Sequence, residues 1–490
     1  MKIDCVLCRK FARSLLTLSM LILGQVMTVP TTHGASFSAT GPTTPPAQGY
    51  YNTPYYPGAV TVSFDLLPTT MSFDLPQYYC MVTENGIKFA PLGAQTYDPR
   101  NGDTTLWGPG RDATCHYAAA WIDRQNAARI VVRARYALCN DNGNIAHSDF
   151  ASGSPYGAGD WADEWWYIYP DGTCTRDVKL YTGLARLSKP YGTFSGVDNV
   201  IHQFMTASII GPQGHVPTDD INTSALQLFK MWGAAMGEPL ALGTNTTISY
   251  SPYPADFGTW RDSNIEWINT KSTYKPFVMG LPYGMRAEPY TLGSDSSSSV
   301  FETWTNYHSV PGYVSALGRM AYYWYYQKHA TTVEQVYLQG MTTNTSPKSE
   351  LMHLAWSWIV PAMLWQTNGV NITHNYLQFT YDPAQKAYVL PRANITPAQF
   401  SFNLISLYDD DDLTNTFWVV HPAIVVSNWS AGAALSVGGS KLTALTEGTD
   451  YRVGHEANSL GGSNLVLWVN KTYFNYTNPT YILNFTVTPK

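Results

Sequence analysis

The sequence has 490 residues, of which 14% are aromatic and only 13% are charged, with a formal net charge of -6. Disordered chains are rich in charge and poor in aromatic residues, so disorder is excluded. Nucleic-acid binding needs a basic excess, so the charge disfavours a nucleic-acid partner. A mean hydropathy of -0.18 excludes a multi-pass membrane protein. The length predicts more than one folded unit, and 38 Gly with 31 Pro favour a turn-rich β protein.

Residues 1–35 have the three parts of a secretory signal peptide. The segment begins with a basic region that contains Lys2, Arg9, Lys10 and Arg13. An apolar run at 15–29 follows, and small residues near Ala35 offer a cleavage site. A single membrane anchor is the alternative, but the run is shorter than the roughly 20 residues that span a bilayer. We therefore expect a secreted or cell-surface protein with no stable membrane anchor after cleavage. Residues 36–58 are predicted to be a Pro/Thr/Tyr-rich linker.

Cysteines and glycosylation sequons agree with export. Four cysteines follow the signal: Cys80, Cys115, Cys139 and Cys174. They predict either two disulfides, in any of three pairings, or four buried thiols. The motif N-x-S/T occurs nine times, at Asn222, Asn245, Asn344, Asn371, Asn394, Asn428, Asn470, Asn475 and Asn484. This abundance indicates a glycoprotein surface, or it reflects a composition rich in Asn, Ser and Thr.

The hydrophobic pattern predicts a mainly β fold. Strands are expected at 59–66, 128–138 and 201–210, and a hairpin at 165–180 turns at Pro170-Asp171-Gly172. Helices are expected at 224–236 and at 349–364, where Pro361 would end the second helix. Residues 59–395 would form a large antiparallel β-sandwich body. The short strands of 396–490 would form a small C-terminal Ig-like β-sandwich.

The segment 159–173 combines acids and tryptophans in the way that a sugar site does. Aromatic rings stack on the apolar face of a pyranose, while polar groups hold its hydroxyls. Substrate-binding residues are therefore predicted at Asp160, Trp161 and Glu164, with His147 close by in the sequence and Arg135 on a basic strip shared with Arg133. The alternative is a core hairpin in which the tryptophans point inward and the arginines make salt bridges.

A second constellation begins at Trp304, which is also a candidate for substrate binding. Asn306, His308, Tyr313 and Arg319 lie within one short span, with His308 as base and Tyr313 as acid. Arginine and asparagine can neutralise a carboxylate. These four residue types suffice for β-elimination from a uronic acid without a cofactor. A structural loop is the alternative interpretation.

Two further readings concern carboxylates. A glycoside hydrolase needs a carboxylate pair, and Asp160, Asp163 and Glu164 are candidates, with Glu302 as a further one. Neighbouring residues of a strand point to opposite faces, so Asp163 and Glu164 would not form that pair. The acidic run 409–412 could bind structural Ca²⁺, but it lacks an EF-hand pattern and a solvated loop is the favoured interpretation.

Two stretches carry a family resemblance. RARYALCN with GDWADEWWYIYPDGT, and the tail from IVVSNWSAGAALSVGG to GGSNLVLWV, resemble a group of secreted, largely uncharacterised proteins. These proteins are similar to polysaccharide lyases with the super-β-sandwich of galactose mutarotase. The resemblance implies an antiparallel β body and β-elimination on an acidic glycan. By residue type it implies the roles already given to His308, Tyr313, Asn306 and Arg319.

The sequence therefore predicts an exported, carbohydrate-active protein, with a uronic-acid polysaccharide as partner and β-elimination as reaction. A glycoside hydrolase and a non-catalytic, glycan-binding surface protein stay open as alternatives.

Overall fold

The fold comes from a computed structural model, in which part of the chain is described. The described residues are 36–44, 60–74, 78–91, 94–97, 106–107, 117–140, 144–146, 148, 155–181, 201–229, 240–243, 264–281, 285–289, 302–305, 312–322, 332–368, 381–391, 397–405, 417–459, 461–475 and 482–490.

One large sheet joins eleven described strands. In spatial order it contains β1 (Ser38–Thr40), β2 (Val60–Ser63), β3 (Thr70–Asp74), β4 (Tyr78–Val82), β5 (Lys88–Phe89), β12 (Ile201–Ile210), β19 (Tyr313–Tyr322) and β17 (Met285–Pro289). β18 (Glu302–Thr305) pairs with β19, and β6 (Ala94–Tyr97) pairs with β12 and with β7 (Leu106–Trp107). Strand β1 lies inside the predicted linker, where Phe37 packs against Phe64 with 6.0 Å between ring centroids.

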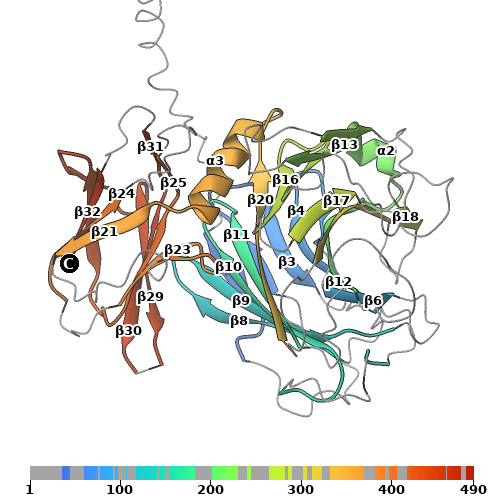
Figure 1. The fold of residues 1–490 in the computed structure, drawn as a ribbon, viewed down its shortest axis with the longest axis horizontal. Coiled ribbons are helices and arrows are strands. Elements are labelled where there is room, and N and C mark those ends of the chain that lie inside the picture. Colours follow the sequence, from blue (N-terminus) through green and yellow to red (C-terminus); the bar gives the residue numbers. More distant parts are fainter. Residues whose placement is uncertain are drawn as a thin grey trace, which may run out of the picture. The chain divides into compact units, whose positions relative to one another are not determined.

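The second large sheet joins nine described strands (Figure 1). Its order is β14 (Leu240–Gly243), β13 (Ile221–Phe229), β15 (Ile265–Thr270), β16 (Lys275–Gly280), β20 (Thr332–Thr342), β11 (Cys174–Tyr181), β10 (Trp161–Ile168), β9 (Ile130–Ala137) and β8 (Ala118–Gln125). β10 and β11 form the predicted antiparallel hairpin, with Trp165 opposite Asp177. The turn at Pro170-Asp171-Gly172 closes it, and Gly172 adopts the positive φ of 77° that the turn requires.

A single hydrophobic core lies between these two sheets. Alternate residues of β9 and β10 point into it, among them Val132, Ala134 and Trp166. From the opposite sheet, Phe73 meets Trp166 edge to face at 5.2 Å between ring centroids. Two antiparallel sheets packed on one core form a β-sandwich, so the predicted mainly β class is confirmed.

The C-terminal part forms a second sandwich, drawn in orange and red (Figure 1). One sheet contains β21 (Met363–Asn368), β24 (Phe400–Ile405), β32 (Ile482–Pro489), β27 (Ala433–Gly438) and β28 (Thr443–Ala444). The other contains β22 (Tyr381–Asp382), β23 (Ala387–Leu390), β26 (Ala423–Val426), β30 (Ser463–Val469) and β29 (Tyr451–Ala457). β25 (Phe417–Val420) and β31 (Thr472–Asn475) pair as a ribbon. The strands of these two sheets thus begin at Met363. The predicted start of the C-terminal domain at residue 396 stays a prediction.

Two helices lie in the described ranges, α2 (Pro217–Asp220) and α3 (Lys348–Ile359). Neither is long and apolar enough to cross a lipid bilayer. α3 confirms the predicted helix at 349–364, and it ends before Pro361. The helix predicted at 224–236 is wrong over its described residues, because β13 is a strand hydrogen-bonded to β14 on one side and β15 on the other. Pairing on both edges overrides the local helix preference there.

The cysteines do not form the predicted pair of disulfides. Cys80, Cys139 and Cys174 are all buried, and no disulfide joins one of them to another. Two disulfides among four cysteines would need at least one bond within this set. Cys115 lies outside the described residues. The strands explain the result, because Cys174 packs in the core between the large sheets while Cys139 packs in a separate cluster with Trp161.

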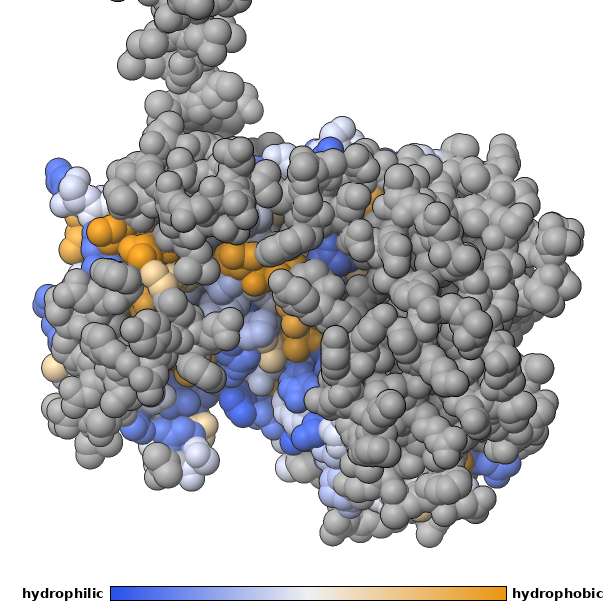
Figure 2. Space-filling view, viewed as in Figure 1, coloured by the Kyte–Doolittle hydropathy of each residue, from blue (hydrophilic) through white to orange (hydrophobic). Residues whose placement is uncertain are grey.

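The outer face of the nine-stranded sheet is covered unevenly. α3 covers one half, where Leu351, Leu354 and Trp358 pack on Phe277 and Leu338. The space-filling view shows hydrophobic residues in orange beside α3 and hydrophilic residues in blue toward β8 (Figure 2). The half formed by β8 to β11 therefore keeps polar side chains on a face that α3 does not cover.

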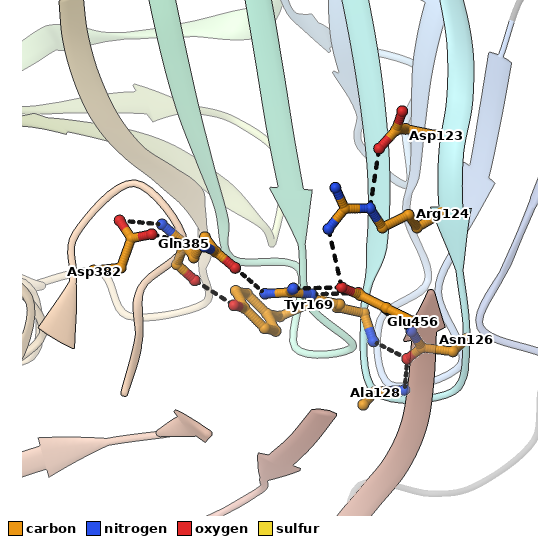
Figure 3. A network of polar contacts seen from close by, with 9 residues as sticks. Asp123, Arg124, Asn126, Ala128, Tyr169, Asp382, Gln385 and Glu456 are labelled. Carbon is orange, nitrogen blue, oxygen red and sulfur yellow. Dashed lines mark hydrogen bonds and ion pairs between the residues drawn. The ribbon is translucent and has the colours of Figure 1, made fainter. Parts of the chain in front are cut away.

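A buried ion pair joins the C-terminal sandwich to the turn between β8 and β9 (Figure 3). Arg129 donates from Nε and Nη2 to the two carboxylate oxygens of Glu456, each at 2.6 Å, and from Nη1 to Gln385 Oε1 at 2.9 Å. Burial alone would raise the pKa of Glu456, but the hydrogen bonds and charge of Arg129 outweigh it and lower that pKa. A Cβ at Gly454 would lie 1.9 Å from Asn126 Oδ1, so glycine permits this close approach.

Glu456→Gln removes one charge of the buried pair and leaves Arg129 uncompensated. We expect the free energy of unfolding to fall by about 3–5 kcal/mol, because an unpaired buried charge is strongly destabilising. Chemical denaturation at neutral pH measures the loss. The control is Glu447→Gln, which breaks the exposed pair of Glu447 with Lys490 at 2.6 Å. The control should change the stability by less than about 1 kcal/mol. Equal effects of the two variants would contradict this account.

Candidate functional site

The outer face of β8 to β11 presents side chains in straight cross-strand rows. One row contains, in strand order, Ala119, Arg135, Asp163, Lys179 and, on β20, Glu334. The next row contains Trp121, Arg133, Trp165, Asp177 and, on β20, Val336. We call Trp121, Arg133, Arg135, Asp163, Trp165, Asp177 and Lys179 the outer strip. Its charges alternate along one row and its tryptophans flank an arginine in the other.

Asp163 holds the outer strip together. Arg135 Nε donates to Asp163 Oδ1 at 2.9 Å, and Arg133 Nη2 lies 3.7 Å from Asp163 Oδ2. The Tyr156 hydroxyl also donates to Asp163, and Arg135 Nη2 donates to that hydroxyl at 2.8 Å. The guanidinium carbon of Arg135 lies 3.6 Å from the centroid of the Tyr156 ring. Two arginines thus share one carboxylate, which leaves a net positive charge at this point.

Arg133 lies between two aromatic rings. Its guanidinium carbon lies 4.5 Å from the Trp165 ring centroid and 5.1 Å from that of Trp121. Its Nε is buried and has no hydrogen-bond partner among the described residues, whereas the side chain as a whole is 23% exposed. The exposed part of a guanidinium held between two tryptophan rings is suited to bind a carboxylate.

Asp177 is the most perturbed carboxyl group on this face. Burial raises the pKa of Asp177 to about 7, and repulsion from Glu334 and Asp382 adds to the rise. Its Oδ1 is buried without a hydrogen-bond partner in the described part of the chain. A carboxyl group with a pKa near neutrality can exchange protons at physiological pH, which is the property of a general acid or base.

The predicted substrate-binding residues are divided between the two faces of the hairpin. Arg135 lies in the outer strip, and Trp161 lies on the same face, where it packs edge to face against Tyr117 at 6.2 Å and near Tyr156. Trp161 is nevertheless only 2% exposed. Asp160 is buried immediately before β10, where its backbone N–H donates to Ala146 O at 2.9 Å.

Glu164 lies on the inner face, in the core between the two large sheets. It is fully buried, and Arg176 Nε and Trp166 Nε1 each donate to its Oε2 at 2.9 Å. The Tyr136 hydroxyl donates to Oε1 at 2.5 Å. These contacts give Glu164 a structural position, and they follow the alternation expected between Asp163 and Glu164.

The second predicted constellation lies on the other large sheet. Tyr313 begins β19 and is buried, and its hydroxyl donates to Asp220 Oδ2 at 2.9 Å. Burial, together with this bond to Asp220, raises the pKa of the Tyr313 hydroxyl. Arg319 pairs through the backbone with Met205 and Glu288. Trp304 lies opposite Val314 in β18.

Several residues of the predicted sites lie outside the described part of the structure, in full or in their side chains. The side chains of Arg319 and Trp304 lie outside the described part of the structure, as do Asn306, His308, His147 and the acidic run 409–412. Their roles stay predictions. The structure therefore groups Arg135 with Arg133 on the outer strip and places Tyr313 in the core, on a different sheet.

Sequence reasoning missed Trp121 and Asp177 as members of the site. The register of the strands could have indicated both residues. The hairpin turn fixes the pairing of β10 with β11, and that pairing sets Asp177 directly opposite Trp165. The raised pKa of Asp177 depends on Asp382, which is distant in sequence, so no local pattern could have indicated it.

No family model matches the sequence, and no curated protein is similar to it in sequence. Solved structures show distant likeness at 8% identity. They include a lysyl oxidase of Pichia pastoris (TM-score 0.24, 56% of this chain and 51% of the oxidase) and a Paenibacillus xanthan lyase (TM-score 0.24, 85% and 50%). A further polysaccharide lyase has a TM-score of 0.20 over 86% and 46% of the two chains. The chain spans about half the length of these proteins.

Asp177→Asn should stabilise the protein, but only at higher pH. The folded-state pKa of about 7 lies above the ordinary value of 3.8, so ionisation of Asp177 disfavours the folded state. The cost is absent below pH 4, grows as the pH rises toward 7, and is complete above it. We expect the variant to gain on the order of 1–3 kcal/mol at pH 8 and little at pH 4.

Denaturation curves at the two pH values measure the difference. The matched control is Asp123→Asn, which changes a more exposed carboxylate paired with Arg124 at 3.1 Å. A gain for Asp177→Asn that is equal at both pH values would contradict the raised pKa.

Proposed function

We propose that this chain is an exported carbohydrate-active protein whose outer strip binds a uronic-acid-containing polysaccharide, which it cleaves by β-elimination. The observation that carries the proposal is Arg133, a partly exposed guanidinium between Trp121 and Trp165. Export is part of the proposal and is supported by the signal-like segment 1–35.

The outer strip has the two properties that recognition of a sugar acid needs. The partly exposed ring of Trp165 can stack on the apolar C–H face of a pyranose, whereas Trp121 is only 2% exposed and supports the arginine from behind. The guanidinium of Arg133 can bind the carboxylate of the same sugar. Since strands are about 4.8 Å apart, a row across four strands extends far enough for a few sugar units. The net charge of -6 disfavours a polyanion in general, so this local positive site would have to overcome it.

The chemistry of elimination assigns a role to Asp177. A carboxylate held by Arg133 makes the hydrogen at C5 of the uronic acid more acidic. Asp177, when ionised, removes that proton, the electron pair forms the C4–C5 double bond, and the C4–O bond breaks. The leaving oxygen then takes a proton from Asp177 or water. Asp177 and Arg133 share one cross-strand row, on either side of Trp165. His308 stays the alternative base predicted from the sequence.

A glycoside hydrolase is the second candidate, and one observation favours it. Asp163 and Asp177 point to the same face, and their environments differ. Asp163 is bound to Arg135, whereas burial raises the pKa of Asp177. A carboxylate beside an arginine and a protonated neighbour are the pair that hydrolysis uses. In this case Asp177 would act as an acid. The hydrogen bonds that already occupy Asp163 make the lyase the better-supported function.

Arg133→Ala should weaken binding to polygalacturonate and alginate by about tenfold or more, because a hydrogen bond to a charged group contributes about 1.5–3 kcal/mol. Calorimetry on the full chain measures the dissociation constant. The ligand control is the same polymer after reduction of its carboxylates to alcohols, for which the two proteins should not differ. The protein control is Lys441→Ala, which removes one exposed charge from the C-terminal sandwich. If both variants weakened binding equally, the effect would come from the change in net charge and would contradict a specific role of Arg133.

The pH dependence of kcat/KM distinguishes the two reactions. As a base in elimination, Asp177 must be ionised, so the rate should rise as the pH passes about 7. As an acid in hydrolysis it must be protonated, so the rate should fall over the same range. Ultraviolet absorbance of the new C4–C5 double bond reports elimination, and reducing ends report both reactions.

Variants complete this test. Asp177→Asn should abolish the inflection near pH 7, whereas Asp123→Asn should keep it. New reducing ends without absorbance would replace the lyase by the hydrolase. If the protein bound the polysaccharide but formed neither the double bond nor new reducing ends, it would be a glycan-binding protein. If only His308→Ala lost the absorbance, His308 would be the base in place of Asp177.

A further inference from the structure

The sequons differ in what their amide nitrogens do in the folded protein. Six of the nine lie in described residues, and the side chains of five of these are described, at Asn222, Asn344, Asn428, Asn470 and Asn484. An N-linked glycan is attached through Nδ2 and is bulky, so its acceptor must present that nitrogen to solvent. The hydrogen bonds of each side chain therefore separate acceptors that the fold tolerates from those that it does not.

Asn344 presents its amide nitrogen to solvent. It lies in the exposed turn between β20 and α3, and Thr345 and Ser346 of the same sequon are also exposed. Its Oδ1 accepts from the backbone N–H of Ser346 at 2.9 Å, and its own backbone N–H donates to Thr342 Oγ1 at 3.0 Å. Both bonds leave Nδ2 unused within the described residues, so a glycan there would displace no contact.

Asn222 and Asn484 use Nδ2 inside the fold. Asn222 Nδ2 donates to Asn269 Oδ1 and to Thr270 O, each at 3.0 Å, which occupies both of its hydrogens. Asn484 Nδ2 donates to Gly439 O at 2.6 Å, from a strand with β24 on one side and β27 on the other. A glycan on either nitrogen would break these bonds.

Asn428 and Asn470 are half-buried, in contrast to the exposed Asn344, and the side chains of both make hydrogen bonds within the fold. Asn428 has a φ of 55°, in the left-handed region, and its Oδ1 accepts from Asn458 Nδ2 at 2.9 Å. Its backbone N–H donates to Asn464 Oδ1 at 3.3 Å, so the three side chains fix one turn. Asn470 is half-buried, and its Nδ2 donates to Thr449 O at 3.4 Å.

We propose that Asn344 is an N-glycosylation site of the folded protein and that Asn222, Asn428 and Asn484 are not. The co-reactant is a lipid-linked oligosaccharyl diphosphate. Nδ2 forms a bond to the anomeric carbon of its sugar, the diphosphate leaves with the electrons of the broken C–O bond, and the amide loses one proton. The inference rests on the export named in the proposed function, and requires no activity on a polysaccharide.

The test secretes residues 36–490 from a glycosylating eukaryotic host behind the host's own secretory signal. Release of glycans by an amidase in ¹⁸O-water converts each occupied Asn into labelled Asp, which peptide mass spectrometry locates. We expect label at Asn344. Because the host supplies the signal, failure of the native signal cannot affect the result, and glycan mapping is independent of binding or cleavage of polysaccharide.

Two variants sharpen the result. Ser346→Ala removes the sequon but keeps Asn344, and the protein should lose the mass of one glycan. Ser430→Ala, the matched control, removes the sequon of Asn428 and should leave the glycan mass unchanged. An unlabelled Asn344, or label at Asn222, Asn428 or Asn484 in the secreted protein, would overturn the proposal.

Discussion

The alternation of side chains along β10 is the constraint on which both the core and the site depend. Trp166 and Glu164 point into the sandwich, and Asp163 and Trp165 point away from it. Each face thereby buries a carboxylate, and each carboxylate needs a cation. Arg176 of β11 supplies it inside, while Arg135 of β9 supplies it outside. A shift of one residue in register would exchange the two faces and leave both charges without their partners.

The C-terminal sandwich contributes to the chemistry of the outer strip as well as to its surroundings. Asp382 belongs to β22 of that sandwich, and its charge helps to raise the pKa of Asp177 on β11. The turn that follows β22 contacts the hairpin end, where Tyr169 donates to Gln385 O. α3 covers the other half of the sheet. α3 thus covers one half of the outer face, while the C-terminal sandwich places a negative charge near Asp177 in the other half.

Much of the fold could be predicted because its signals are local. Pro170 and Gly172 define the central hairpin, and Pro361 limits α3. The segment of β13 misled the prediction because pairing with strands on both edges decided its structure. At the site, the sequence indicated the aromatic and acidic hairpin but could not assign faces to all its residues. The joint role of Tyr313 and its sequence neighbours stays a prediction, whereas the outer strip unites strands that are joined only by register.

The buried pair of Arg129 and Glu456 has a consequence for how the stability of the protein responds to ionic strength. Dissolved ions screen charges that face water, and at physiological salt the screening acts over about 8 Å. The pair of Lys490 with Glu447 is exposed to that effect. Arg129 and Glu456 are each about 1% exposed, so counterions have little access to them. The ion pair that attaches the C-terminal sandwich at this point should therefore keep its strength at both low and high salt concentration. An attachment made of surface ion pairs would weaken at high salt.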